Sequence, residues 1–398
     1  MNPFLDRLQP YPFERLNALK AGVTPAPGYA SVMLSIGEPK HPPPDFVLQL
    51  LSDPEVMRRD LAAYPATRGS AELRAAIASW LAARFRVSVD PEGQVLPVAG
   101  TREALFSFGQ AMLSGRPGAL VVLPNPFYQI YEGAVLLRGA TPYFVNCHAG
   151  NGYLPDYRSV PEDVWARCEL LYLCSPGNPT GRTLDVETLC WLHEQAQRHD
   201  FLIAADECYS EIYLDESRPP AGLLQAAAAA GHDDFSRCVV FHSLSKRSNL
   251  PGLRSGFVAG DARVLAAYYQ YRTYQGCALP NYVQLASTAA WQDEAHVREN
   301  RAAYRRKFAA VTPILAPVLD LPQPEGGFYH WVATPGDDEA FARDLYAARN
   351  ITVLPGSYLA RDAHGSNPGK GHVRIAWVAP AEDCEAAARN IAEWLSAR

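Results

Sequence analysis

Residues 238–247, CVVFHSLSKR, decide how this chain of 398 residues is organised. Apolar residues open the segment and predict a buried strand. Lys246 follows among hydroxyl side chains, and Arg254 lies eight residues further on. Desolvation and a second cation both disfavour an ammonium ion in such a place, and a neutral amine can attack a carbonyl carbon. A solvated loop lysine is the ordinary alternative, because Ser-x-x-Lys is short and common. The other motif segments of the chain, described next, argue against this alternative for Lys246.

Two other strand signals end in polar residues. Asn178 lies in the segment SPGNPTG after an apolar run, and a strand that meets Pro, Gly and Asn ends there. Asp206 and Tyr209 follow a second run, FLIAA. A carboxylate at the end of a buried strand is costly unless it meets a cation. Open α/β sheets bind ligands at the carboxyl ends of their strands. The alternatives are a plain turn at Asn178 and a helix cap or core salt bridge at Asp206.

In this order and spacing, the three segments resemble the class I/II aminotransferases, which are pyridoxal 5′-phosphate (PLP) enzymes of fold type I. The resemblance extends from LSIGEP near the start to VRIA near the end. It implies that Lys246 binds the cofactor covalently and moves protons during catalysis. It also implies that Asp206 pairs with the pyridine nitrogen, and that Asn178 and Tyr209 hydrogen-bond the phenolic oxygen. The protein would thereby tune the electron sink that the cofactor supplies.

A phosphate site is predicted by the segment VAGTREAL, which reads as a strand, a glycine turn and the start of a helix. The N–H groups of Gly100, Thr101 and Arg102 would face an anion at that helix N-terminus. Gly-Thr before a helix is also a good cap, so the motif alone is weak. Ser243 and Arg254 match further phosphate ligands of the family, and a guanidinium fork suits a phosphate.

The resemblance also assigns a residue above the cofactor ring. Tyr128 follows a strand signal and the turn PNP, and it would lie over the pyridine ring. A shift of one residue would put Phe127 there instead. The family also tends to hold two Asn-Pro peptide bonds near the cofactor in cis, which here are Asn125–Pro126 and Asn178–Pro179.

Substrate and subunit contacts come from three further matches. Arg374, in the alternating segment HVRIAW, would hold the substrate α-carboxylate in its guanidinium fork. Gly37 would contact the substrate near the same group. Tyr64 would reach the phosphate of the other subunit, so the resemblance implies a homodimer with shared active sites. The alternative for Tyr64 is an aromatic side chain buried in its own subunit before a helix.

Composition excludes several classes of protein. The net charge is −6 and no basic run is present, which argues against nucleic-acid binding. No apolar stretch approaches the roughly 20 residues needed to span a membrane, and no signal peptide is visible. Eight cysteines without Cys-x-x-Cys spacing and ten histidines without a metal-type pair predict reduced thiols, a cytoplasmic protein and no metal site.

The predicted fold class is α/β, the PLP-dependent transferase fold type I, with two domains. From residue 45 to residue 275, short apolar strands alternate with helical stretches, which predicts a large PLP-binding domain with a mainly parallel sheet covered by helices. Residues 1–44 and 276–398 would form a smaller α+β domain that contains one long helix over residues 282–316. The predicted strands of the large domain are 94–98, 120–123, 141–145, 170–174, 201–205, 239–242 and 256–259.

The segment FHSLSKRSNLPGLR, residues 241–254, also resembles the bacterial succinyldiaminopimelate aminotransferases. This resemblance implies nitrogen transfer from glutamate to N-succinyl-2-amino-6-oxopimelate in lysine biosynthesis, hence small amino-acid and 2-oxo-acid substrates. Arg102, Arg68 and Lys370 are candidates to hold the distal carboxylates, with no pattern to choose among them. Two alternatives are other enzymes: a broader aspartate, alanine or aromatic aminotransferase, and a PLP-dependent lyase or synthase on the same fold. The third alternative is a cofactor-binding regulator. Such a regulator would be expected to carry a DNA-binding domain, for which the N-terminal stretch is too short.

Overall fold

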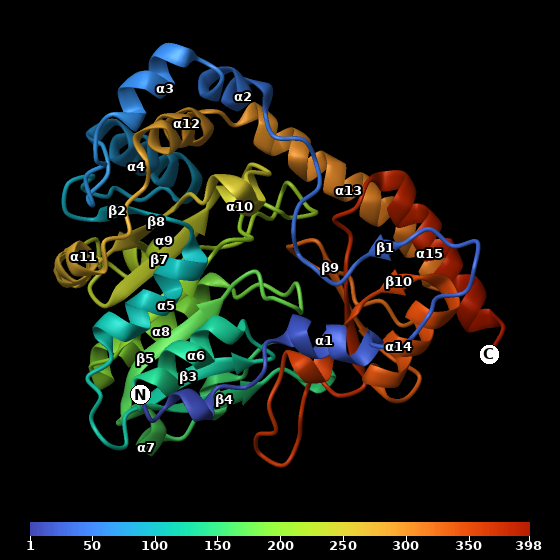
Figure 1. Ribbon diagram of the computed structural model, residues 1–398. Coiled ribbons are helices and arrows are strands. Elements are labelled where there is room, and N and C mark those ends of the chain that lie inside the picture. The colour runs from blue at the N-terminus through green and yellow to red at the C-terminus, as the bar shows by residue number, and fades with distance from the viewer.

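The computed structural model describes all 398 residues, and its centre is a seven-stranded sheet in the order β2-β8-β7-β6-β5-β3-β4 (Figure 1). Its strands are β2 (Val95–Val98), β3 (Leu120–Asn125), β4 (Thr141–Asn146), β5 (Cys168–Cys174), β6 (Leu202–Asp206), β7 (Cys238–Ser243) and β8 (Gly256–Gly260). The strands from β4 to β7 are parallel, whereas β8 is antiparallel to both β7 and β2. The carboxyl ends of all strands except β8 therefore meet at one edge.

The predicted strands of this sheet are confirmed, with ends that differ by at most two residues. Side-chain alternation explains the agreement, because successive residues of a strand face opposite sides. Leu171 and Leu173 pack into one apolar layer, and Leu170 and Tyr172 pack into the other. A sheet buried on both faces reads as a continuous apolar run, which is the pattern that the sequence presents here.

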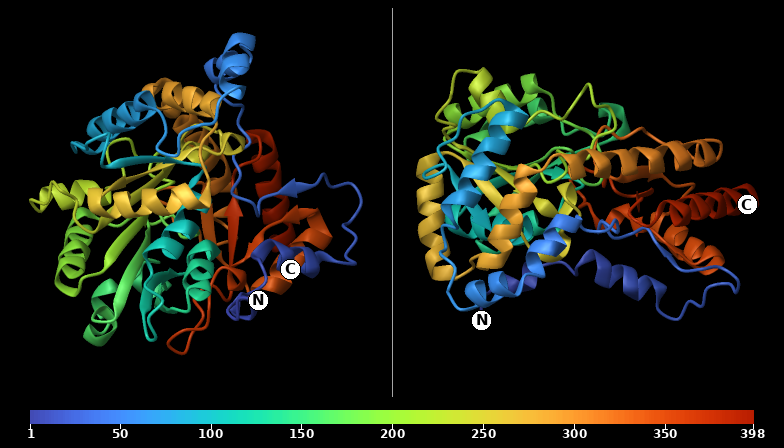
Figure 2. Two further views of the ribbon diagram at one scale, coloured as in Figure 1. Left: turned by 60° about the vertical axis from the view of Figure 1, so that its left-hand side comes forward. Right: turned by 90° about the horizontal axis from the view of Figure 1, so that it is seen from above.

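Helices cover both faces of the sheet (Figures 1 and 2). The first apolar layer contains residues of α4 (Ala71–Phe85), α8 (Val186–His199), α9 (Leu223–Ala229) and α12 (Asn281–Gln292). The second contains residues of α5 (Thr101–Met112), α6 (Gln129–Leu137) and α11 (Ala262–Gln275). Shorter helices complete this unit: α2 (Asp45–Leu51), α3 (Pro54–Leu61), α7 (Glu162–Trp165) and α10 (Leu244–Arg247), with 3-10 turns η2 (Ala149–Asn151), η3 (Tyr157–Ser159) and η4 (Pro251–Leu253).

A second, smaller unit has its own core (Figure 1, right). Its antiparallel sheet has the order β11-β12-β9, and β1 pairs with β10 in a separate two-stranded sheet. Its elements are β1 (Val32–Met33), α13 (Ala295–Leu315), β9 (Tyr329–Ala333), α14 (Asp338–Arg349), β10 (Ile351–Thr352), β11 (Leu354–Pro355), η5 (Gly356–Tyr358), β12 (His372–Ala376) and α15 (Ala381–Ser396). This mixture of helices and an antiparallel sheet agrees with the predicted α+β character.

The single helix predicted over residues 282–316 is wrong, because two helices occupy this range. Asp293 lies between α12 and α13, and its carboxylate accepts the His296 N–H at 3.0 Å, which caps the start of α13. Helix α12 packs against α4 and α2, and its Val283 and Trp291 belong to the core of the large sheet. The division predicted after Gln275 would place α12 in the smaller domain, whereas its packing places it with the large sheet.

The N-terminal stretch runs along both units (Figure 1). The 3-10 turn η1 (Leu5–Arg7) contacts α6, whereas α1 (Pro12–Lys20) packs on α14. Strand β1 then pairs with β10 through Val32 and Ile351. The N-terminal stretch therefore packs on the smaller unit through α1 and β1, and its first residues also reach the large unit.

None of the helices combines the length and the apolar character needed to cross a membrane. All eight cysteines are free thiols. No group of three or more His, Cys, Asp or Glu side chains is arranged to hold a metal ion.

Candidate active site

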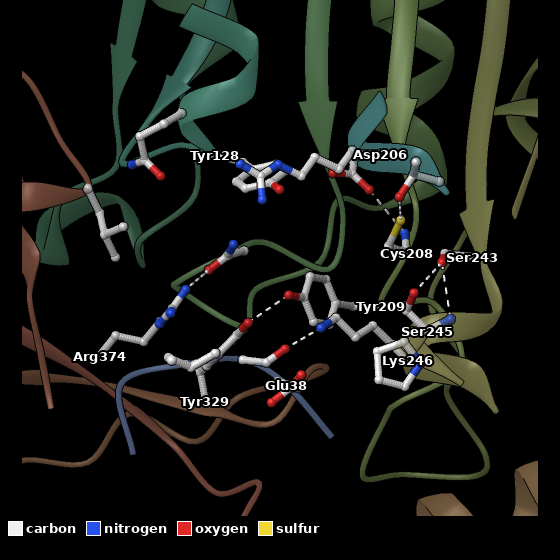
Figure 3. Close-up of a pocket in the computed structure, with 18 of the residues that line it drawn as sticks. Glu38, Tyr128, Asp206, Cys208, Tyr209, Ser243, Ser245, Lys246, Tyr329 and Arg374 are labelled. Atoms are coloured by element: carbon white, nitrogen blue, oxygen red, sulfur yellow. Dashed lines mark hydrogen bonds between the residues drawn. The ribbon is translucent and has the colours of Figure 1, made fainter. Parts of the chain in front are cut away.

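A cavity of about 390 Å³ lies at the carboxyl edge of the large sheet, and both units contribute to its walls (Figure 3). All predicted site residues except Gly100 and Tyr64 line it. The predicted residues on its walls are Gly37, Thr101, Arg102, Tyr128, Asn178, Asp206, Tyr209, Ser243, Lys246, Arg254 and Arg374. The fold brings them together because they follow β2, β3, β5, β6 and β7 or come from the segments that cover this edge.

Lys246 lies on the short helix α10, directly after β7. Ser243 caps this helix, since its hydroxyl oxygen accepts the Ser245 N–H at 3.1 Å. Asn300 of α13 donates to the Lys246 carbonyl at 3.0 Å and holds the same turn from the other side. The Lys246 amine donates to the Gly37 carbonyl. Burial, together with the charges of Arg374 and Arg254, lowers the pKa of Lys246 to about 8.

Asp206 ends β6 and is almost fully buried. Its Oδ2 accepts the Tyr131 hydroxyl at 2.6 Å, and its Oδ1 accepts the Cys208 N–H at 3.3 Å. Burial raises the pKa of Asp206, although these neutral donors oppose the shift. A cation inside the cavity would stabilise this carboxylate strongly, as expected for the partner of a protonated ring nitrogen.

Two tyrosine hydroxyls separate the lysine from the arginine in the view of Figure 3. The Tyr209 and Tyr329 hydroxyl oxygens are 2.6 Å apart. Gly37 lies against this pair, because a Cβ atom there would overlap the Tyr329 hydroxyl and approach the Phe328 ring. Because Gly37 has no side chain, the segment that contains it can lie directly against Tyr329 in the cavity wall.

Arg374 on β12 is 4% exposed. Its NH1 donates to Asn178 Oδ1 at 2.8 Å and its NH2 to the Ser35 carbonyl at 2.6 Å, while its Nε has no partner. The guanidinium also stacks 4.5 Å from the Tyr329 ring centroid. A guanidinium that lines the cavity and has only neutral hydrogen-bond partners suits a carboxylate.

The start of α5 carries several groups that suit an anion. Gly100 is the N-cap residue, has φ of 86° and offers no side chain to cap the first N–H groups. The Arg254 guanidinium lies where a Cβ of Gly100 would be, so only glycine allows this approach. Arg254 is exposed as a residue, yet it lines the cavity with Thr101 and Ser243. Backbone donors, hydroxyls and a guanidinium together fit a phosphate.

Tyr128 and Phe127 take different positions. Tyr128 lines the cavity, whereas Phe127 is 1% exposed and stacks on Phe144 at 5.2 Å in the core. The alternative that Phe127 lies over a bound ring is therefore not supported.

The bonds Asn125–Pro126 and Asn178–Pro179 are both cis as predicted, and Ser175–Pro176 is cis as well.

Tyr64 does not reach the cavity of its own chain. It lies between α3 and α4 and is fully exposed, with a relative exposure of 102%. The alternative that it is buried in its own subunit is therefore wrong.

Two of the three cations considered for distal carboxylates lie elsewhere. Arg68 stacks on the Tyr269 ring, and Lys370 pairs with Asp362 at 3.3 Å on the surface. Only Arg102 lines the cavity, where its guanidinium lies 5.3 Å from the Tyr11 ring centroid.

Sequence reasoning missed several residues of the cavity wall. Cys208 and Ser245 lie inside segments that were singled out for their neighbours, so closer attention to those segments could have found them. Tyr11, Phe13 and Tyr329 are far from the motifs in sequence, and only the fold brings them near. The unpredicted lining residues are Tyr11, Phe13, Ile36, Glu38, Gln129, Cys208, Ser245, Pro251, Tyr329, Leu354 and Leu359.

The donor set fits PLP. The α5 N-terminus with Ser243 and Arg254 suits the phosphate, Lys246 the aldehyde, and Asp206 the ring nitrogen. Tyr209 and Asn178 supply polar groups for the phenolic oxygen. A carboxylate site at Arg374 in the same cavity suits an amino-acid substrate. This combination defines the class of protein as a PLP enzyme that acts on amino acids.

Comparison with known proteins leads to the same class. The family model "Aminotransferase class I and II" matches residues 30–391. The LL-diaminopimelate aminotransferase of Syntrophobacter fumaroxidans is 32% identical over 381 residues, which cover 94% of this chain and 93% of that protein. An aminotransferase structure from Neisseria meningitidis is 48% identical with a TM-score of 0.94, and the match covers 99% of this chain and 100% of that one. A probable N-succinyldiaminopimelate aminotransferase from Thermus thermophilus is 27% identical with a TM-score of 0.83, over 96% and 99% of the chains.

The chain therefore belongs to the class I and II aminotransferases. Members of this family use PLP, and the protein is a PLP-dependent aminotransferase of fold type I.

Proposed function

We propose that the protein transfers an amino group between glutamate and a diaminopimelate derivative, with N-succinyl-LL-2,6-diaminopimelate as the leading substrate. The observation that carries the proposal is that Lys246 and Arg374 line the same cavity. An amine with a lowered pKa suits the cofactor aldehyde. A guanidinium whose hydrogen-bond partners are neutral suits the α-carboxylate that all amino-acid substrates share.

Each remaining residue has a defined task in this proposal. PLP, when bound, supplies an electron sink for the charge that develops on the substrate α-carbon. Asp206 holds the ring nitrogen in its protonated form, and Tyr209 and Asn178 donate to the phenolic oxygen. The Lys246 amine, in its neutral form, would act as the general base that removes the α-proton of the substrate. Arg374 orients the substrate so that this proton faces the lysine.

Arg102 is our candidate for the distal end of a long dicarboxylate. It lines the cavity from α5 in the large unit, whereas Arg374 does so from β12 in the small unit. Two cations on different walls favour a substrate with two separated carboxylates over alanine or an aromatic amino acid. The names of the relatives support both forms of diaminopimelate: the Thermus neighbour is described for the succinyl form, and the Syntrophobacter relative for the free LL form. The free form is therefore the second candidate.

We also propose a homodimer in which Tyr64 reaches the partner's site. Tyr64 is fully exposed, and Leu61 at the end of α3 and Tyr274 on α11 are exposed as well. Asn281 at the start of α12 donates to the Ala63 carbonyl at 3.3 Å and ties the residue before Tyr64 to α12. Aromatic residues on an exposed face favour a subunit interface, and symmetric dimers are the commonest oligomers.

The test is a half-reaction screen. The loaded enzyme is mixed with single amino acids, the cofactor absorbance is followed, and the released 2-oxo acid is identified. Glutamate and N-succinyl-LL-diaminopimelate should both react, with kcat/KM values well above those for alanine, aspartate and phenylalanine. Reaction with free LL-diaminopimelate instead would select the second candidate. Equal rates with all amino acids would favour a broader aminotransferase, and elimination products without amino transfer would favour a lyase.

A further inference from the structure

Tyr131 lies directly behind Asp206 and outside the cavity lining. Its hydroxyl donates to Asp206 Oδ2 at 2.6 Å, and the whole residue is buried. The other carboxylate oxygen accepts the Cys208 N–H at the longer distance of 3.3 Å, and the Cys208 thiol also favours the ionised form of Asp206. The phenol is thus a closer donor to this carboxylate than the Cys208 N–H.

Aromatic packing fixes the direction of the Tyr131 hydroxyl. The ring stacks on Tyr172 with a centroid distance of 4.8 Å and an interplanar angle of 8°. It also meets the Tyr128 ring edge-on, at 5.8 Å and 86°. Tyr128 belongs to the cavity wall, so the start of α6 carries both a wall residue and the donor to Asp206.

We propose that Tyr131 is a positioning residue that keeps Asp206 ionised and aimed at the ring nitrogen of the cofactor. This inference rests on the role of Asp206 in the proposed function. A hydrogen bond from a hydroxyl to a carboxylate is charge-assisted and favours the ionised acid. Burial raises the pKa of Tyr131 well above its ordinary value, so the phenol stays a neutral donor.

The test uses two matched variants. Tyr131→Phe removes the donor to Asp206 and keeps the ring stack. Tyr172→Phe is the control, because Tyr172 is equally buried, shares the same stack and donates instead to the Leu105 carbonyl at 2.8 Å. The dissociation constants of the apoproteins are measured for PLP and for its carbon analogue, in which a C–H group replaces the ring nitrogen. The ratio of the two dissociation constants measures how much the contact between Asp206 and the ring nitrogen contributes to cofactor binding.

Wild-type protein should prefer PLP over the carbon analogue. Tyr131→Phe should reduce this preference about tenfold or more, in keeping with a hydrogen bond to a charged group, and Tyr172→Phe should leave it unchanged. In an Asp206→Asn background, Tyr131→Phe should cause no further loss of preference. Circular dichroism and thermal unfolding of each apoprotein check that the variants fold.

Two different failures can be told apart. If Tyr131→Phe keeps the wild-type preference while Asp206→Asn loses it, the role of Tyr131 is refuted and that of Asp206 stands. If wild-type protein shows no preference, or Asp206→Asn retains it, the proposed role of Asp206 fails and the inference fails with it.

Discussion

Lys246 and Arg374 are two of the four basic side chains that line the cavity, and the cavity suits them to different tasks. Lys246 loses proton affinity because water and counter-charges are scarce around its amine, and its pKa falls to about 8. Arg374 is held in a fixed orientation by Asn178 and the Ser35 carbonyl. The same environment therefore favours a nucleophile at one residue and a rigid anion site at the other.

Replacement of Arg374 should weaken every amino-acid substrate alike. Arg374→Ala should cost about 2–5 kcal/mol of binding free energy, the range for breaking a desolvated charge pair. Arg374→Lys keeps the charge but loses the two-pronged geometry, so it should recover only part of that loss. Steady-state kinetics with the amino donor and the 2-oxo acid measure both effects. A loss confined to one of the two substrates would instead make Arg374 a side-chain specificity residue.

Cofactor loading should follow the ionisation of Lys246. Only the neutral amine attacks the aldehyde, and a base whose pKa is lowered becomes neutral at lower pH. The rate at which apoprotein binds PLP covalently should rise with pH and level off above about pH 8, as expected for this lysine. Stopped-flow absorbance across a pH series gives the midpoint. A rate that still climbed toward the ordinary lysine value of 10.5 would contradict the lowered pKa.

At the scale of elements, the proposed anion site at the start of α5 depends on the space that Gly100 leaves for Arg254. Gly100→Ala should strain the backbone at φ 86° and displace the Arg254 guanidinium. Gly118→Ala is the control, since Gly118 has φ of 81° and open space around its Cα. Both variants should lose about 1–3 kcal/mol of stability, but only Gly100→Ala should bind PLP more weakly. Similar PLP affinities for the two variants would remove Arg254 and α5 from the phosphate site.

The strands of the large sheet could be predicted from the sequence, whereas the residues that line the cavity could be predicted only in part. The sheet strands are apolar runs bounded by turns, and the motif residues follow them at once, so local sequence was sufficient to place Asn178, Asp206 and Lys246 at strand ends. Their proposed roles came from the family resemblance. Tyr131 and Tyr329 have no such signal, because their partners Asp206 and Tyr209 are distant in sequence. The break between α12 and α13 was missed because helical periodicity continues across Asp293, whose capping contact only the structure reveals.

At the scale of the whole molecule, the cavity needs both units. The large sheet supplies the lysine and the carboxylate, and the smaller unit supplies Arg374 and Tyr329. Helix α13 links the two, since Asn300 near its start holds the Lys246 turn while Val311 and Leu315 pack in the smaller core (Figure 2). A shift of the smaller unit would therefore change the surroundings of Lys246.

Mixed dimers test whether the sites are shared between subunits. Lys246→Ala and Tyr64→Ala proteins, each weak alone, are dissociated and reassociated together. One site of a mixed dimer then combines an intact Lys246 with the partner's intact Tyr64, so activity should recover well above either parent. Unchanged activity despite proven mixed dimers, and a proven defect in Tyr64→Ala, would remove Tyr64 from a shared site.

The central claim is that Lys246 in this cavity is the residue that carries PLP. Borohydride reduction of the loaded enzyme, followed by peptide mass spectrometry, tests it most directly. The account predicts one modified peptide, with the cofactor mass on Lys246, and no modification in a Lys246→Ala protein. Attachment to another lysine, or wild-type turnover by Lys246→Ala, would contradict it.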